Sequence, residues 1–307
     1  MSSLFTAEFL QKLEQLKLLS RNVFTGKMKG ERRSRKRGAS VEFADYRNYV
    51  QGDEFRHIDW YAYARLENLF LKLFMEEEDL SIYFLIDGSH SMAFPAPQNN
   101  SSAGRTSGEP WSKFAYAKRI VGALSYIALA NLDRVAISLF NNRCCQNLPL
   151  THGPARIFKI FRFLEQIEPA EGITDLTKAV TNFLSEHKKR GLVVIISDLM
   201  NVNGYESGLR NLKFYKYEPM VIHLFAPAEI NPPPGGDWRL IDSETGGAVE
   251  ISLSHRIIKT YQQRLNIFCE QAESYCRSLG INYLRTTTDT DFEDLILKYL
   301  KQAQMVG

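Results

Sequence analysis

Residues 81–92 read SIYFLIDGSHSM, and this stretch decides the fold class of the 307-residue chain. A continuous apolar run that ends in an aspartate is typical of a strand buried on both faces of its sheet. In an open α/β sheet, ligands bind in the crevice at the carboxyl ends of such strands. Asp87, Ser89 and Ser91 therefore bring three oxygen donors to one point, a set that suits a hard cation such as Mg²⁺ or Mn²⁺.

A second stretch repeats this pattern further along the chain. Residues 192–198 read LVVIISD, so another apolar, β-branched strand ends in a carboxylate, that of Asp198. Two such strands in one parallel sheet would release Asp87 and Asp198 at the same edge. Neighbouring carboxylates repel each other, and one must take up a proton unless a cation lies between them. The pair therefore favours a metal site.

The rest of the chain alternates between helical and strand-like apolar spacing. The spacing predicts helices over residues 4–19, 112–130, 154–167, 175–188, 205–216, 255–279 and 292–300. It predicts strands over residues 70–76, 134–140, 220–225 and 281–285, and a hairpin over 238–251. This order of strands and helices predicts an α/β fold with a doubly wound, mostly parallel sheet.

We divide the chain into three parts. Residues 1–79 hold an N-terminal helix, a basic loop and a segment rich in acids, arginines and aromatics. Residues 80–230 hold the sheet and its metal site, and residues 231–307 hold a hairpin and helices that complete the fold. The N-terminal helix is amphipathic and is expected to pack on the body of the protein. A membrane-surface helix is the alternative, but the polar face carries few cations.

Composition sets limits on the class of protein. The net charge is only +3 and 44% of the residues are hydrophobic, as in a water-soluble globular protein. The sequence contains no run of 18 apolar residues, so no membrane span is predicted, and the N-terminus does not have the pattern of a signal peptide. The four cysteines form no CxxC pair, which indicates reduced thiols. We therefore expect a cytoplasmic protein.

Three stretches outside the sheet invite functional hypotheses. Residues 40–79 are expected to be ordered by ion pairs and aromatic packing as a lid on the sheet, and no nucleophile is spaced to join His57 and Asp59. Residues 21–37 carry eight Lys or Arg against one acid, which is typical of a solvated loop or a protein-docking surface. Contact with nucleic acid is the alternative, although no aromatic residue follows Phe24 to stack on bases. Residues 94–110 form a low-complexity loop, either a functional flap or a tolerated insertion.

The motif set resembles the metal-ion-dependent adhesion site of von Willebrand factor A domains. That site uses an Asp-x-Ser-x-Ser run, then a threonine from a second loop, then an aspartate from a third. Here the matching residues, in the same chain order, are Asp87, Ser89, Ser91, Thr174 and Asp198. The resemblance implies a von Willebrand factor A-like fold that binds Mg²⁺ or Mn²⁺ with one position left for an acidic residue of a partner.

The flanking segments resemble a narrower group, the bacterial family catalogued as domain of unknown function 58. Residues 38–79 look like that family's signature, and residues 238–247, which read WRLIDSETGG, are similar to its C-terminal part. The resemblance implies a non-enzymatic adaptor or chaperone-like partner of a MoxR-type AAA+ ATPase in the maturation or assembly of other proteins. Many relatives carry transmembrane helices, and the lack of one here implies a cytoplasmic short form.

Two readings of Asp87 compete with metal binding. A phosphatase-like hydrolase could use Asp87 as a phosphoryl acceptor, but such enzymes place a second acid two residues on, where this chain has Ser89. In a plain scaffold, Ser89 and Ser91 would only cap the following turn. That reading leaves Thr174 and Asp198 unexplained.

Overall fold

The computed structural model describes most of the chain. The described residues are 4–6, 9–14, 42–75, 80–95, 111–141, 146–169, 174–201, 203–233, 235–241, 247–252, 254–291, 294–296 and 298–299. The basic stretch 21–37 and residues 96–110 of the low-complexity loop lie outside them. The chain forms two compact units, one of residues 1–20 and 80–306 and the other built from residues 21–79. No helix in the described part is long and apolar enough to cross a membrane.

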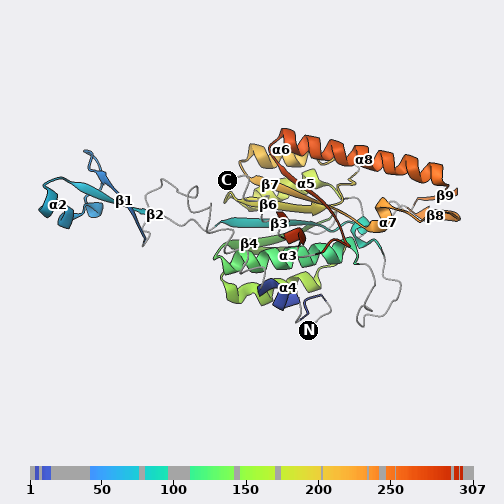
Figure 1. Cartoon of the computed structure of the whole chain (residues 1–307), viewed down its shortest axis with the longest axis horizontal. Coiled ribbons are helices and arrows are strands. Elements are labelled where there is room, and N and C mark those ends of the chain that lie inside the picture. The colour runs from blue at the N-terminus through green and yellow to red at the C-terminus, as the bar shows by residue number, and fades with distance from the viewer. Residues whose placement is uncertain are drawn as a thin grey trace. The chain divides into compact units, whose positions relative to one another are not determined.

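The larger unit is built on a six-stranded sheet (Figure 1). Its strands, in spatial order, are β10 (Asn282–Thr287), β7 (Glu218–Phe225), β6 (Leu192–Ser197), β3 (Ser81–Asp87), β4 (Arg134–Phe140) and β5 (Gln146–His152). All neighbouring pairs are parallel except β4 and β5. The predicted doubly wound, mostly parallel sheet is therefore confirmed.

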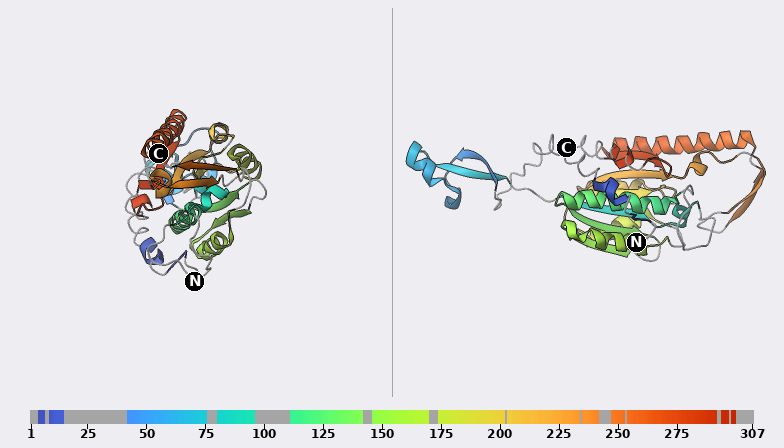
Figure 2. Two further views of the ribbon diagram at one scale, coloured as in Figure 1. Left: turned by 90° about the vertical axis from the view of Figure 1, so that its right-hand side faces the viewer. Right: turned by 60° about the horizontal axis from the view of Figure 1, so that its bottom comes forward.

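Helices cover both faces of this sheet, as Figures 1 and 2 show. On one face lie α3 (Lys113–Ala130) and α4 (Ile157–Gln166), and on the other lie α5 (Leu176–Glu186), α6 (Glu206–Phe214) and α8 (His255–Ser278). The next strand in the chain, β4, lies on one side of β3 in the sheet, and β6 lies on the other side. The strand order thus reverses between β3 and β6, which is where doubly wound sheets place their ligands.

Burial explains why residues 81–87 form the central strand. Every residue of β3 is buried, as expected for a strand covered on both faces. Tyr83 and Leu85 join the apolar cluster beneath α5, α6 and α8, and the alternate residues face the opposite way. Each fully buried apolar side chain of this size stabilises the fold by about 1.5–3 kcal/mol.

The edge strand β5 was not predicted. It pairs antiparallel with β4 and buries only Leu148 and Thr151. Its sequence, QNLPLTH, is polar and contains Pro149, which cannot donate a backbone hydrogen bond. Such a residue is tolerated at the edge of a sheet, where one side of the strand needs no partner.

The N-terminal segment packs on the larger unit as expected. Residues 9–14 are helical, and Phe5, Phe9 and Leu13 are buried. The Phe5 ring stacks on Phe161 of α4 with 4.3 Å between ring centres. Gly122 of α3 makes room for that ring, because a Cβ atom at this position would lie 2.6 Å from Phe5 Cε1.

Beyond β7 the chain adds α7 (Pro227–Ile230) and the hairpin of β8 (Asp237–Ile241) and β9 (Ala248–Ser252) before α8. The predicted hairpin is confirmed. Two short 3-10 turns, η2 (His90–Ala93) and η3 (Pro154–Arg156), follow β3 and β5.

The smaller unit contains β1 (Glu42–Asn48), η1 (Phe55–His57), α2 (Trp60–Leu66) and β2 (Phe70–Met75), with β1 and β2 antiparallel. Asp59 caps α2 by accepting hydrogen bonds from the N–H groups of Tyr61 and Ala62. The same carboxylate accepts a hydrogen bond from Tyr46 Oη at 2.7 Å and pairs with Lys72 Nζ at 3.2 Å. The expected ordering by ion pairs and aromatic side chains is confirmed for this unit.

Candidate functional site

The candidate site lies where β3 and β6 end side by side. Asp87 is the last residue of β3, and Asp198 follows the last residue of β6. The two strands are parallel, with Ile86 opposite Ile196. Both carboxylates therefore leave the sheet at the same edge, at the point where the strand order reverses.

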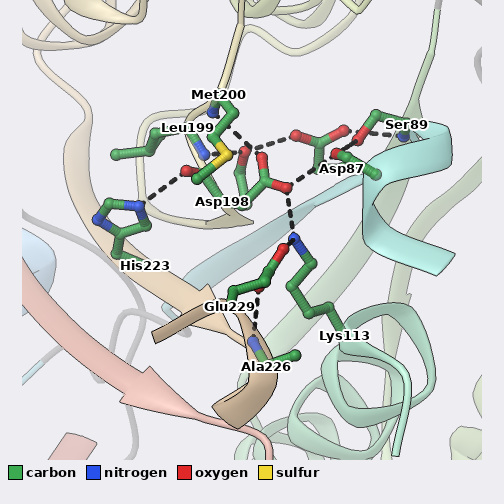
Figure 3. Close-up of polar contacts among 11 residues, drawn as sticks. Asp87, Ser89, Lys113, Asp198, Leu199, Met200, His223, Ala226 and Glu229 are labelled. Carbon is green, nitrogen blue, oxygen red and sulfur yellow. Dashed lines mark hydrogen bonds and ion pairs between the residues drawn. The ribbon is translucent and has the colours of Figure 1, made fainter. Parts of the chain in front are cut away.

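The Asp87 carboxylate is held at both oxygens. Oδ1 accepts a hydrogen bond from the backbone N–H of Ser89 at 2.9 Å, and Oδ2 accepts one from Ser197 Oγ (Figure 3). Gly88, between Asp87 and Ser89, lets the turn pass close to β4, because a Cβ atom at this position would lie 2.9 Å from Leu139 Cδ1. Asp87 is 1% exposed, so its charge is almost fully removed from water.

Ser89 and Ser91 connect β3 to Asp198. The two hydroxyl oxygens lie 2.9 Å apart, and Ser91 Oγ donates to Asp198 Oδ2 at 2.8 Å. The Ser89 side chain makes no capping hydrogen bond to the turn that follows it. This geometry argues against the reading in which the serines only cap a turn.

In the turn after β6, backbone N–H groups donate hydrogen bonds to side chains at the site. Leu199 has a left-handed φ of 55°, a conformation that is costly for a side chain of this kind. It lets the N–H of Leu199 reach Ser197 Oγ at 2.9 Å and the N–H of Met200 reach Asp198 Oδ1 at 3.1 Å. His223 Nε2 lies 2.8 Å from the Asp198 carbonyl oxygen and so fixes the same turn from β7.

Sequence reasoning missed two charged residues at this edge. Lys113, the first residue of α3, is 0% exposed and donates from Nζ to Asp198 Oδ2 at 2.7 Å and to Glu229 Oε1 at 2.6 Å (Figure 3). Glu229 comes from α7, and its Oε2 accepts a hydrogen bond from the N–H of Ala226 at 2.7 Å. Lys113 opens a largely apolar helix that also carries Lys118 and Arg119, so the sequence does not single it out. His223 was also missed, although it interrupts the apolar run of β7.

Charge and burial shift the pKa values of these groups in opposite directions. Burial, with the charge of Asp198, raises the pKa of Asp87 to about 6. Burial would also raise the pKa of Asp198, but the charge and hydrogen bond of Lys113 outweigh it and lower that pKa. The pKa of Lys113 is raised because Asp198 and Glu229 outweigh the effect of burial. Burial raises the pKa of Glu229 despite Lys113.

Thr174 is the one predicted site residue whose side chain forms no hydrogen bond in the described structure. It lies just before α5, is 1% exposed, and its Oγ1 has no hydrogen-bond partner. A buried hydroxyl without a partner is destabilising and calls for an explanation. Among the described residues, no three His, Cys, Asp or Glu side chains gather as metal ligands. A cation at this edge would rest on two carboxylates and on hydroxyl groups.

The residues present fit a divalent cation. Asp87, Asp198 and Glu229 carry three negative charges when ionised, and Lys113 supplies one positive charge. Two negative charges then remain uncompensated among these four side chains, and burying unpaired charge is costly. One Mg²⁺ or Mn²⁺ would balance them, and carboxylate and hydroxyl oxygens are the ligands that these cations prefer.

Comparison with known proteins gives a family match and several distant relatives. A family model described as "Protein of unknown function DUF58" matches residues 45–267. A Mycobacterium tuberculosis protein named "Uncharacterized protein Rv1480" is 22% identical over 290 residues, which cover 94% of this chain and 87% of that protein.

Solved structures are similar at a lower level. The BatB protein of Bacteroides thetaiotaomicron is 14% identical, with a TM-score of 0.44, and the match covers 74% of this chain and 98% of that one. The VWA domain of SpRpn10 is 11% identical, with a TM-score of 0.40, over 72% of this chain and 95% of that one.

Proposed function

We propose that this chain, which belongs to the family described as "Protein of unknown function DUF58", is a non-enzymatic, metal-dependent protein-binding module. The match over residues 45–267 confirms the family resemblance read from the sequence. The proposed contact is made at the edge of the sheet where β3 and β6 end.

One observation carries this proposal: among the described residues, the buried carboxylates at that edge outnumber the positive charges that contact them. Asp87 and Asp198 are 1% and 2% exposed, and the Lys113 ammonium that pairs with Asp198 is shared with Glu229. The unpartnered Oγ1 of Thr174 points to the same conclusion. A divalent cation would supply the missing charge and a partner for that hydroxyl.

Five residues would hold the ion through oxygen atoms: Asp87, Ser89, Ser91, Thr174 and Asp198. A bound Mg²⁺ supplies a coordination position that a carboxylate of another protein can fill, because this ion seldom takes all its ligands from one protein. Ser91 is partly exposed and Met200 is 41% exposed, so a partner would approach from the side of these residues. The proposed partners are a MoxR-type AAA+ ATPase and an acidic residue of a client protein.

The hydrolase alternative is less well supported by the geometry. A phosphatase of this kind places a second acid two residues after the phosphoryl acceptor, and that position is Ser89, whose hydroxyl lies 2.9 Å from that of Ser91. Phosphatase turnover that disappears in Asp87→Asn would favour the hydrolase over the binding module. Nucleic-acid binding through residues 21–37 remains a separate hypothesis, to be tested by the salt dependence of DNA affinity.

Thermal melts with and without Mg²⁺ test the proposed function. Metal at about 100 times its dissociation constant should stabilise the wild type by roughly 2.7 kcal/mol. Asp198→Asn should remove this shift, while Glu273→Gln, an exposed carboxylate on α8, should keep it. An equal shift in all three proteins would contradict the proposal.

Capture of the ATPase tests the partner. We expect recovery of the MoxR-type ATPase from a mixture of purified proteins in Mg²⁺ and its loss after chelation. Equal recovery under both conditions would argue against a contact made through the metal.

A further inference from the structure

We infer that Lys113 and Glu229 form a neutral ion pair that positions Asp198 and sets the affinity of this edge for a divalent cation. The inference rests on the proposed function and deepens it. It assigns a role to two residues, one on α3 and one on α7, that lie outside the predicted ligand set.

Burial shows that the Lys113 ammonium belongs to the site. Lys113 is 0% exposed, and its Nζ lies within 2.7 Å of one carboxylate oxygen on each of Asp198 and Glu229. A buried ammonium is tolerated only where it is paired and hydrogen-bonded. The backbone N–H of Lys113 donates to the Phe94 carbonyl oxygen at 3.0 Å, which anchors the same residue to the segment after β3.

Glu229 is held in place without help from Lys113. Its Oε2 accepts a hydrogen bond from the N–H of Ala226, so the carboxylate caps its own short helix. Glu229 lies on α7, which directly follows β7, the strand next to β6 in the sheet. Glu229 is thus built into the edge as a fixed counter-charge for Lys113.

The two charges together decide what cation the edge attracts. With Lys113 alone, the positive charge would cancel one of the two aspartates and leave a single negative charge. With Glu229 alone, three negative charges would gather at one buried point. With both present, Asp198 is held by a hydrogen bond from Lys113, and the charge left at the edge matches one divalent cation.

Calorimetric titration of the full chain with Mg²⁺ tests this inference by removing one charge of the pair and then the other. Glu229→Gln should weaken Mg²⁺ binding by about tenfold, because Lys113 then cancels one aspartate; this corresponds to about 1.4 kcal/mol. Adding Lys113→Met to Glu229→Gln restores the charge and should bring the dissociation constant back to within about threefold of the wild type. Lys118→Met removes a buried lysine from the same helix, away from the site, and should leave binding unchanged.

Thermal melts in chelator give a readout that does not depend on bound metal. Lys113→Met alone leaves three carboxylates without a cation, so it should lower the melting temperature, and the double variant should recover part of the loss. If Glu229→Gln binds Mg²⁺ as the wild type does, or the double variant binds as weakly as Glu229→Gln, the inference is overturned while the proposed function stands. If the wild type binds no Mg²⁺, both fall.

Discussion

The burial of Lys118 makes the stability of the protein depend on pH. It lies on α3, is 7% exposed, and its ammonium is 4.8 Å from the centre of the Phe114 ring. Burial lowers the pKa of Lys118 to about 8, and the charges of Glu168 and Glu165 offset only part of this effect. At neutral pH the lysine is charged in both the folded and unfolded chain, so its burial is destabilising.

Replacing Lys118 should therefore stabilise the protein. At pH 7 we expect Lys118→Met to raise the free energy of unfolding by about 1–3 kcal/mol, from a pKa difference worth about 1.4 kcal/mol per unit. Between pH 8 and about 10.5 the unfolded chain binds more protons at this residue than the folded chain, so wild-type stability gains on the variant as pH rises. Urea unfolding of both proteins at pH 7 and pH 9.5 measures this difference. A gap that widens with pH would contradict the account.

Sequence reasoning located the residues of the site unevenly, for a physical reason. Asp87, Ser89 and Asp198 each follow an apolar strand, and the rule that parallel strands end at one edge brings them together. Lys113 is the first residue of the long helix α3 and Glu229 lies within the short helix α7, and their meeting depends on how the two helices pack. Local sequence carries no record of that packing.

At the scale of elements, one glycine lets the N-terminal segment sit on α3. Gly122→Leu would drive a side chain into the space filled by the Phe5 ring. Overpacking of this kind costs about 1–3 kcal/mol, and we expect that loss in the free energy of unfolding measured in urea. In a Phe5→Ala background the same change should cost much less. Equal losses in both backgrounds would show that the contact does not hold the segment.

Strands differ in how far the sequence predicts them. The interior strands β3, β4, β6 and β7 are apolar on both faces, so composition alone marks them. The edge strand β5 is selected by its backbone pairing with β4, and its polar, proline-containing sequence gives no such mark. The long helices were predicted from their apolar spacing, whereas α7 is a single turn and is too short to show such a pattern.

At the scale of the whole molecule, the chain folds as two compact units. The larger unit contains the sheet, its covering helices and all five predicted ligand residues, and the smaller unit is held by β1, β2 and the contacts of Asp59. The expectation that residues 40–79 form a lid on the sheet stays a prediction. Because the five proposed ligand residues all belong to the larger unit, we expect the proposed metal site to form without the smaller one.

Removal of the smaller unit tests this independence. A chain in which residues 21–79 are replaced by a flexible Gly/Ser linker should still unfold cooperatively and keep the Mg²⁺-dependent rise in melting temperature. Circular dichroism melts with and without Mg²⁺ provide the measurement. Loss of the cooperative transition would show that the larger unit depends on the segment removed.

The most direct test of the central claim is a count of divalent ions bound per chain. Isothermal titration of the metal-free full chain with Mn²⁺ should give one site that Mg²⁺ competes for. Binding should be weakened at least about tenfold in Asp198→Asn, which removes the charge of a proposed ligand, and in Thr174→Val, which removes a proposed hydroxyl ligand. Glu273→Gln should titrate as the wild type does. Wild-type protein that takes up no Mn²⁺, or variants that bind it as tightly as the wild type, would contradict the account.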